Sequence, residues 1–120
     1  MSDENLKLRT KQFALRIIKL VESLPHDGTS SVLGRQLLRA GTSVGANYRA
    51  VCRSKSTADF ISKMGTVEEE ADESGYWMEL LADSGKIKLG KISALLQESS
   101  ELTAIAVSSI NTARKSASRR

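Results

Sequence analysis

Hydrophobic side chains recur at steps of three and four residues through four successive segments of the chain, and this spacing places them on one face of an α-helix. The segments cover residues 4–24, 30–53, 57–83 and 89–113. Nowhere do β-branched residues alternate with polar ones for long enough to indicate a sheet strand. The pattern therefore predicts an all-α protein.

Short polar breaks separate the four segments. Pro25 to Gly28 ends the first, Ser30 or Ser31 is the expected cap of the second, Ser56 or Thr57 the cap of the third, and Ser84-Gly85 the stop that follows it. Breaks this short make successive helices antiparallel neighbours. We expect one domain over residues 1–113, an antiparallel up-down-up-down four-helix bundle, followed by a flexible basic tail over residues 114–120.

The second segment contains glycines where an amphipathic helix would normally carry larger side chains. Gly41 and Gly45 lie within its apolar spacing, between Arg39 and Arg49. A helix-interior glycine costs about 1 kcal/mol relative to alanine, so a glycine there indicates that a neighbouring helix packs too closely for a side chain. The sequence predicts that this flank of the helix faces inward.

Composition agrees with a single helical domain. The chain has 120 residues, 40% of them hydrophobic, with one proline and one cysteine. Cys52 cannot form an internal disulfide, and no apolar run approaches the ~18 residues of a membrane span. We therefore expect a cytoplasmic protein with no membrane association.

Charge is distributed unevenly within the net +4. Between residues 28 and 58 there are five cations and no acid: Arg35, Arg39, Arg49, Arg53 and Lys55. Residues 59–83 hold eight acids and one cation. The four arginines fall within an arc of about 80° opposite the apolar face and form a stripe about 27 Å long.

Such a stripe spans several phosphates, and arginine can bind phosphate oxygens with two hydrogen bonds at once. The sequence thus favours RNA or DNA as a partner, with Arg114, Lys115, Arg119 and Arg120 as a second basic segment. The alternative is that the acidic third helix, in the same or another subunit, neutralises the stripe. No exposed aromatic residues are interleaved for base stacking, so binding would favour backbone over sequence.

The glutamates of the third segment could be interpreted as metal ligands or general acids. Di-iron bundles, however, pair inward-facing glutamates with a Glu-x-x-His motif, and the single histidine, His26, lies in a turn. Cys52 has no second cysteine or histidine near it in sequence and fits a small buried hydrophobe. We predict no enzyme, no metal and no cofactor.

Several apolar residues fall outside the core-facing arcs. Trp77 and Leu81 widen the apolar surface of the third helix, and Leu15, Ile18 and Leu38 lie off the arcs of theirs. Exposed apolar patches mark association surfaces, so we expect a homo-oligomer. Asn47, at the margin of an apolar arc, needs a hydrogen-bond partner, either within the fold or at an interface.

Two stretches resemble a known family. The first is the run Gln36 to Tyr48, with its Arg-Ala-x-x-Ser-Val-x-Ala-Asn core. The second comprises Asp59 to Met64 and Glu68 to Leu81, and the latter segment ends in Tyr-Trp-Met-Glu-Leu-Leu. The chain resembles, over roughly residues 13–96, the bacterial four-helix-bundle family encoded in intervening sequences of 23S ribosomal RNA genes. Accessory proteins of diversity-generating retroelements share that fold.

The resemblance implies a homopentamer without catalytic activity and with a role in nucleic-acid binding. By the same resemblance, Arg39, Ser43 and Asn47 occupy motif positions that are structural or interfacial. The retroelement relatives imply an alternative, an accessory scaffold that docks on a reverse transcriptase through Trp77 and the acidic helix. After Tyr48, where the family often has a glutamate, this chain has Ala50 and Val51.

Overall fold

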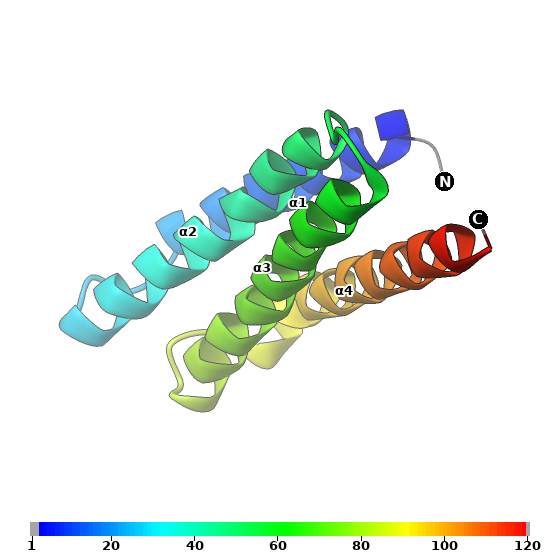
Figure 1. Cartoon of the computed structure of the whole chain (residues 1–120). Coiled ribbons are helices and arrows are strands. Elements are labelled where there is room, and N and C mark those ends of the chain that lie inside the picture. The colour runs from blue at the N-terminus through cyan, green and yellow to red at the C-terminus, as the bar shows by residue number, and fades with distance from the viewer. Residues whose placement is uncertain (1–2, 120) are drawn as a thin grey trace.

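The computed structural model describes residues 3–119 and contains, over that range, four α-helices joined by short turns. They are α1 (Asp3–Glu22), α2 (Gly28–Val51), α3 (Thr57–Asp83) and α4 (Leu89–Ser118). Each helix packs antiparallel to the next, and the bundle is about 54 Å long (Figure 1). The predicted all-α, antiparallel four-helix bundle is confirmed.

The ends of α3 follow directly from its sequence. The Ser56 hydroxyl accepts a hydrogen bond from the backbone N–H of Asp59 at 3.0 Å, which satisfies one of the free donors of the first turn. At the other end Gly85 adopts a φ of +79°, and the Lys86 N–H bonds the Leu81 carbonyl at 2.9 Å, as in a Schellman turn. The predicted cap and stop of this helix are confirmed.

The start of α2 differs from the prediction of Ser30 or Ser31 as its cap. The helix begins at Gly28, and the Asp27 carboxylate is the N-cap, accepting from the Ser30 N–H at 2.8 Å. This backbone hydrogen bond is the main reason that the pKa of Asp27 lies below its ordinary value, with a further contribution from Lys86. Ser30 is itself buried against the cap.

The end of α4 also differs from the prediction. The helix continues to Ser118, five residues past the predicted boundary at 113. Arg114 and Lys115, predicted to begin a flexible tail, therefore lie within α4, since Ala, Lys and Arg all favour helix. Arg120 lies outside the described residues.

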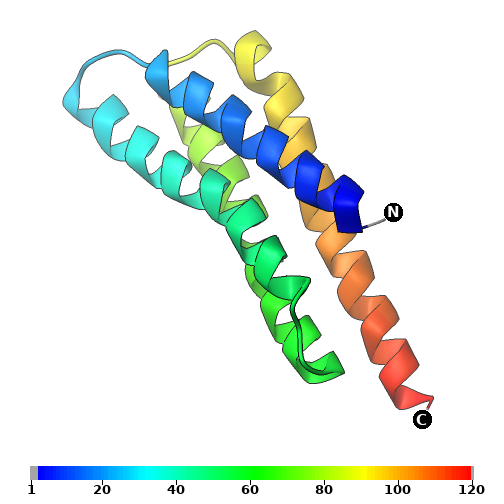
Figure 2. The ribbon, with the colours of Figure 1, turned by 90° about the horizontal axis from the view of Figure 1, so that it is seen from above.

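The core lies along the bundle axis, and α3 packs against both α2 and α4 (Figure 2). The largest fully buried apolar side chains come from all four helices: Phe13, Ile17, Leu37, Val44, Met78, Leu81 and Ile92. Leu81 is thus a core residue, and the prediction that it lies outside the core is wrong. With helices on two sides, α3 buries a wider arc than one face.

The seam between α1 and α4 has fewer contacts than the other three and is joined by a polar cluster that the sequence analysis missed. Arg9 donates two hydrogen bonds of 2.7 Å to the Glu98 carboxylate and one of 3.0 Å to Glu101. Glu98, which makes the largest contribution, and Glu101 raise the pKa of Arg9 above its ordinary value. The sequence holds a signal for this cluster, because Glu98 and Glu101 are the only acids between residues 89 and 118.

Candidate nucleic-acid interface

The orientation of α2 is set by its glycines. A Cβ at Gly41 would lie 2.8 Å from two side-chain carbons of Ile17, and one at Gly45 would lie 3.2 Å from the Thr10 hydroxyl. Both contacts are with α1, so this flank of α2 packs inward against a close neighbour. The four arginines lie opposite the buried face of α2 and are exposed, as the pattern predicts.

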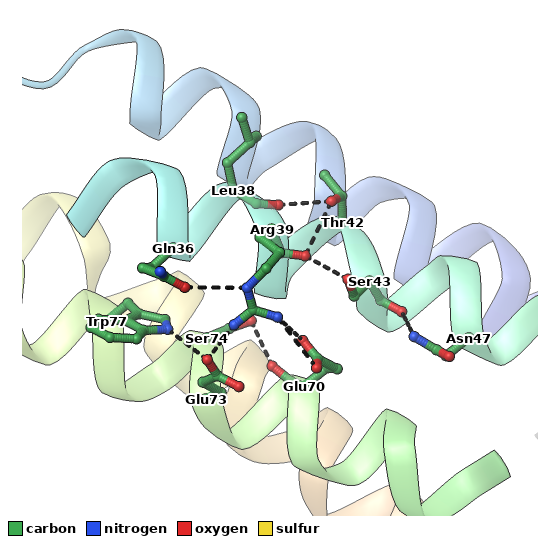
Figure 3. Close-up of polar contacts among 10 residues, drawn as sticks. All are labelled: Gln36, Leu38, Arg39, Thr42, Ser43, Asn47, Glu70, Glu73, Ser74 and Trp77. Carbon is green, nitrogen blue, oxygen red and sulfur yellow. Dashed lines mark hydrogen bonds and ion pairs between the residues drawn. The ribbon is translucent and has the colours of Figure 1, made fainter. Parts of the chain in front are cut away.

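Arg39 is the one member of the predicted stripe that the structure pairs with carboxylates of the same chain. Its guanidinium contacts Glu70 at 3.1 Å and also bonds Glu73, and its Nε donates to Gln36 at 3.2 Å (Figure 3). Trp77 donates its indole N–H to the same Glu73 at 3.1 Å. Arg39 therefore joins α2 to the acidic helix α3. The predicted alternative, in which acids of α3 neutralise the arginine stripe, holds at this one position within the chain.

The remaining arginines of the stripe are differently placed. Arg35, Arg49 and Arg53 are exposed, and none of the three has a carboxylate within 4 Å among the described residues. Lys55 is also exposed, but its backbone N–H bonds the Asp59 carboxylate at 3.0 Å. Lys63, chiefly, and Lys55 hold the pKa of Asp59 below its ordinary value. Three unpaired guanidinium groups thus remain on this face.

Topology brings a second group of cations to the end of the bundle where α2 stops. Because α2 and α4 run in the same direction, their carboxyl ends lie at the same end (Figure 1). Arg53 and Lys55 lie there, together with Arg114 and Lys115 of α4 and Arg119, the C-cap of that helix. The predicted stripe and the predicted basic segment therefore share one end of the molecule.

Ser43 and Asn47 bond within their own helix. The Ser43 hydroxyl donates to the Arg39 carbonyl at 2.6 Å, and the Asn47 amide donates to the Ser43 carbonyl at 2.8 Å. Both side chains are half-buried on the α3 side of α2 (Figure 3). The expected partner of Asn47 is thus a carbonyl of α2 itself.

The predicted interface residue Trp77 is half-buried against the core, and its neighbour Tyr76 is more exposed, at 52%. The two rings meet edge to face, with centroids 5.2 Å apart. Of the other residues expected off the core arcs, Leu15 is exposed, whereas Ile18 and Leu38 are partly buried. The exposed aromatic ring of α3 is therefore Tyr76, which the sequence analysis did not single out.

The described residues contain neither a metal-ligand cluster nor a membrane-spanning helix. No group of three or more His, Cys, Asp or Glu side chains is placed to hold a metal ion. Within the same residues, no helix has an apolar stretch long enough to cross a membrane.

Comparison with known proteins gives one family and a structural relative. The model of the family described as 23S rRNA-intervening sequence protein matches residues 4–108. A crystal structure from Bacteroides thetaiotaomicron, described as a protein of unknown function from the S23 ribosomal protein family, is 35% identical with a TM-score of 0.81. The match covers 88% of this chain and 97% of that one. No curated protein matches the chain.

Proposed function

This chain belongs to the 23S rRNA-intervening sequence protein family, and we propose that it is a non-catalytic module that binds the phosphate backbone of RNA or DNA. The observation that carries the proposal is the unpaired state of Arg35, Arg49 and Arg53 on one exposed face. They extend over about 27 Å, the length of about eight phosphates of one strand.

Backbone recognition is favoured over base recognition by what surrounds these arginines. Base stacking in sequence-tolerant binders uses exposed aromatic side chains beside the cations. Tyr76, the one exposed aromatic ring among the described residues, lies on α3 and not among the arginines. Binding should therefore depend strongly on salt and weakly on sequence.

The proposed module is a homo-oligomer, for which the family resemblance suggests five subunits. Support comes from residues 92–113 of α4, which carry the exposed Val107 and have Glu98 and Glu101 as their only charged side chains. Tyr76 lies beside this helix, at a groove between α3 and α4. A weakly charged surface with exposed apolar side chains is typical of association surfaces.

A second candidate function is an accessory scaffold that docks on a reverse transcriptase. The observation that favours it is the exposed row of Asp72, Tyr76 and Glu79 on α3, an acidic surface with an aromatic centre. Recovery of a protein partner through this row after nuclease treatment, with loss of the partner on Tyr76→Ala, would favour the scaffold. Recovery that nuclease abolishes would favour nucleic-acid binding.

The direct test compares two triple variants of equal charge. Each phosphate contact contributes about 0.9 to the slope of log affinity against log salt concentration. At 0.1 M salt, one contact therefore raises the affinity about 8-fold relative to its value at 1 M salt. Replacing Arg35, Arg49 and Arg53 by Gln should therefore weaken binding of a mixed-sequence RNA duplex about 500-fold. The control replaces Lys19, Lys88 and Lys91, exposed cations outside this face. Equal affinities of the two variants would refute the proposal.

A further inference from the structure

Small side chains line part of the groove between α1 and α2, together with Leu8 and with longer charged side chains. Its volume is about 570 Å³, and Ala14 of α1 faces Gly45 and Ala46 of α2 across it. The two threonines of its lining, Thr10 and Thr42, donate their hydroxyls to carbonyls of their own helices at 2.7 Å.

Cations from both helices also line the groove: Lys7 and Lys11 from α1, and Arg49 from α2. Lys11 and Arg49 have no carboxylate within 4 Å in the part of the chain that the structure describes. Lys7 lies 3.8 Å from Glu4, whose side chain is 86% exposed, and an ion pair of this length at such a site holds its partners weakly. Glu4 is the one acid of the lining, so its three cations give the groove a net positive charge that is open to an anionic ligand.

Arg49 connects the groove to the arginine stripe. On α2 it lies about 80° around the helix axis from Arg39, on the side of α1 and not of α3. Arg39 faces α3 and Arg49 faces α1, so the unpaired guanidinium of Arg49 lies on the same side of α2 as Lys7 and Lys11. The cations of the two helices thus form one surface across the groove.

We propose that this groove holds one phosphodiester strand, with Lys7, Lys11 and Arg49 contacting its phosphates. Packed helices lie 8–10 Å apart, whereas a duplex is wider than its own ~12 Å major groove, so a whole duplex cannot enter the crevice between the helices and at most one backbone can. The strand is either single-stranded or one strand of a duplex. This inference rests on the proposed function and extends it from α2 to α1.

The charge test replaces Lys7 and Lys11 by Gln. Two lost phosphate contacts, each contributing about 0.7 to the salt slope for a single strand, should weaken binding of a mixed-sequence 20-nucleotide RNA about 25-fold at 0.1 M salt. The control replaces Lys88 and Lys91 by Gln, at the opposite end of the bundle, and should weaken binding less than threefold. Equal losses in the two double variants would overturn the inference, because they would report net charge alone.

The occupancy test leaves the charge unchanged. Ala46→Leu fills the groove from an exposed helical position, and it should weaken binding at least tenfold by excluding the strand from Lys7 and Lys11. The control is Ala94→Leu, a similarly exposed alanine on α4, with unchanged affinity. Equal unfolding temperatures for both variants would establish that each is folded. Undiminished affinity of Ala46→Leu would overturn the inference.

Both tests are carried out with the single strand and with its duplex. Weakening of either complex by both groove variants supports the inference, and the probe affected identifies the source of the strand. If the Arg35 and Arg53 substitutions weaken binding while the groove variants do not, the groove inference fails and the proposed function stands. If the unaltered protein binds neither probe at 0.05 M salt, both fail.

Discussion

Gly41→Ala tests the close packing of α1 on α2 that turns the arginines outward. The added methyl would lie 2.8 Å from two carbons of Ile17 and 3.1 Å from its Cβ. Ile17 is fully buried, and its β-branched side chain has one preferred rotamer in a helix. The methyl can therefore be accommodated only if the two helices separate.

The expected loss of stability follows from two opposing effects. Overpacking a core costs about 1–3 kcal/mol, and a contact this close with a fixed side chain lies in the upper half of that range. Replacing a helical glycine by alanine contributes about 1 kcal/mol in the other direction. The net loss of about 1–2 kcal/mol should lower the unfolding temperature by about 4–8 °C for a domain of this size.

Gly65→Ala is the matched control. Gly65 is also inside a helix, but a Cβ there would meet nothing within 4 Å. The same substitution should stabilise the protein by up to about 1 kcal/mol. Thermal unfolding is compared at one protein concentration, because association would make the midpoint depend on it. A rise in midpoint for Gly41→Ala as large as that for Gly65→Ala would refute the packing argument.

A double variant identifies the cause of the effect. Ile17→Ala alone should cost about 2–5 kcal/mol, because it leaves a cavity in the core. The double variant should lose about 1 kcal/mol less stability than the sum of the losses of the two single variants, since the new methyl enters the space that Ile17 vacates. Strict additivity would mean that the two residues do not compete for this space.

Three further predictions concern helix ends and charges. Ser56→Ala removes the cap of α3 and should cost about 1 kcal/mol in urea unfolding. Arg9→Gln removes the bidentate bond to half-buried Glu98 and should cost about 1–2 kcal/mol, with amide exchange rising first in α1; unchanged exchange would contradict this. Because the pKa of Asp27 and that of Asp59 are lowered by folding, their contribution to stability is present above about pH 4 and lost as the pH falls below it. A urea midpoint that rises in acid would contradict the sign.

Much of the fold could be predicted because hydrophobic spacing and local capping determine it. The bounds of α3 follow from Ser56 and Gly85 alone. The predicted N-cap of α2 is wrong because Pro25 to Gly28 read as a turn, although an aspartate such as Asp27 can cap a helix as well as a serine does. The end of α4 was placed too early because the apolar stripe stops at Ala113, while helix propensity continues beyond it.

The candidate site could be predicted only in part. Periodicity places four arginines on one side of α2, but it does not specify which neighbour lies on which side of that helix. Arg39 therefore pairs with the acids of α3, while Arg49 lines a groove with the lysines of α1, a division set by the arrangement of the helices in space. For the same reason Leu81, between two neighbouring helices, is buried.

Salt dependence tests most directly whether the exposed cations of α1 and α2 bind a phosphate backbone. The measurement is the slope of log affinity against log salt for one RNA duplex and for a second of scrambled sequence. The account predicts a slope of about −4 to −5 for both sequences, from contacts by Arg35, Arg49, Arg53, Lys7 and Lys11. The magnitude of the slope should fall by about 0.9 for each of these cations that is replaced by Gln. A slope near zero, or one that these substitutions leave unchanged, would contradict phosphate binding by this surface.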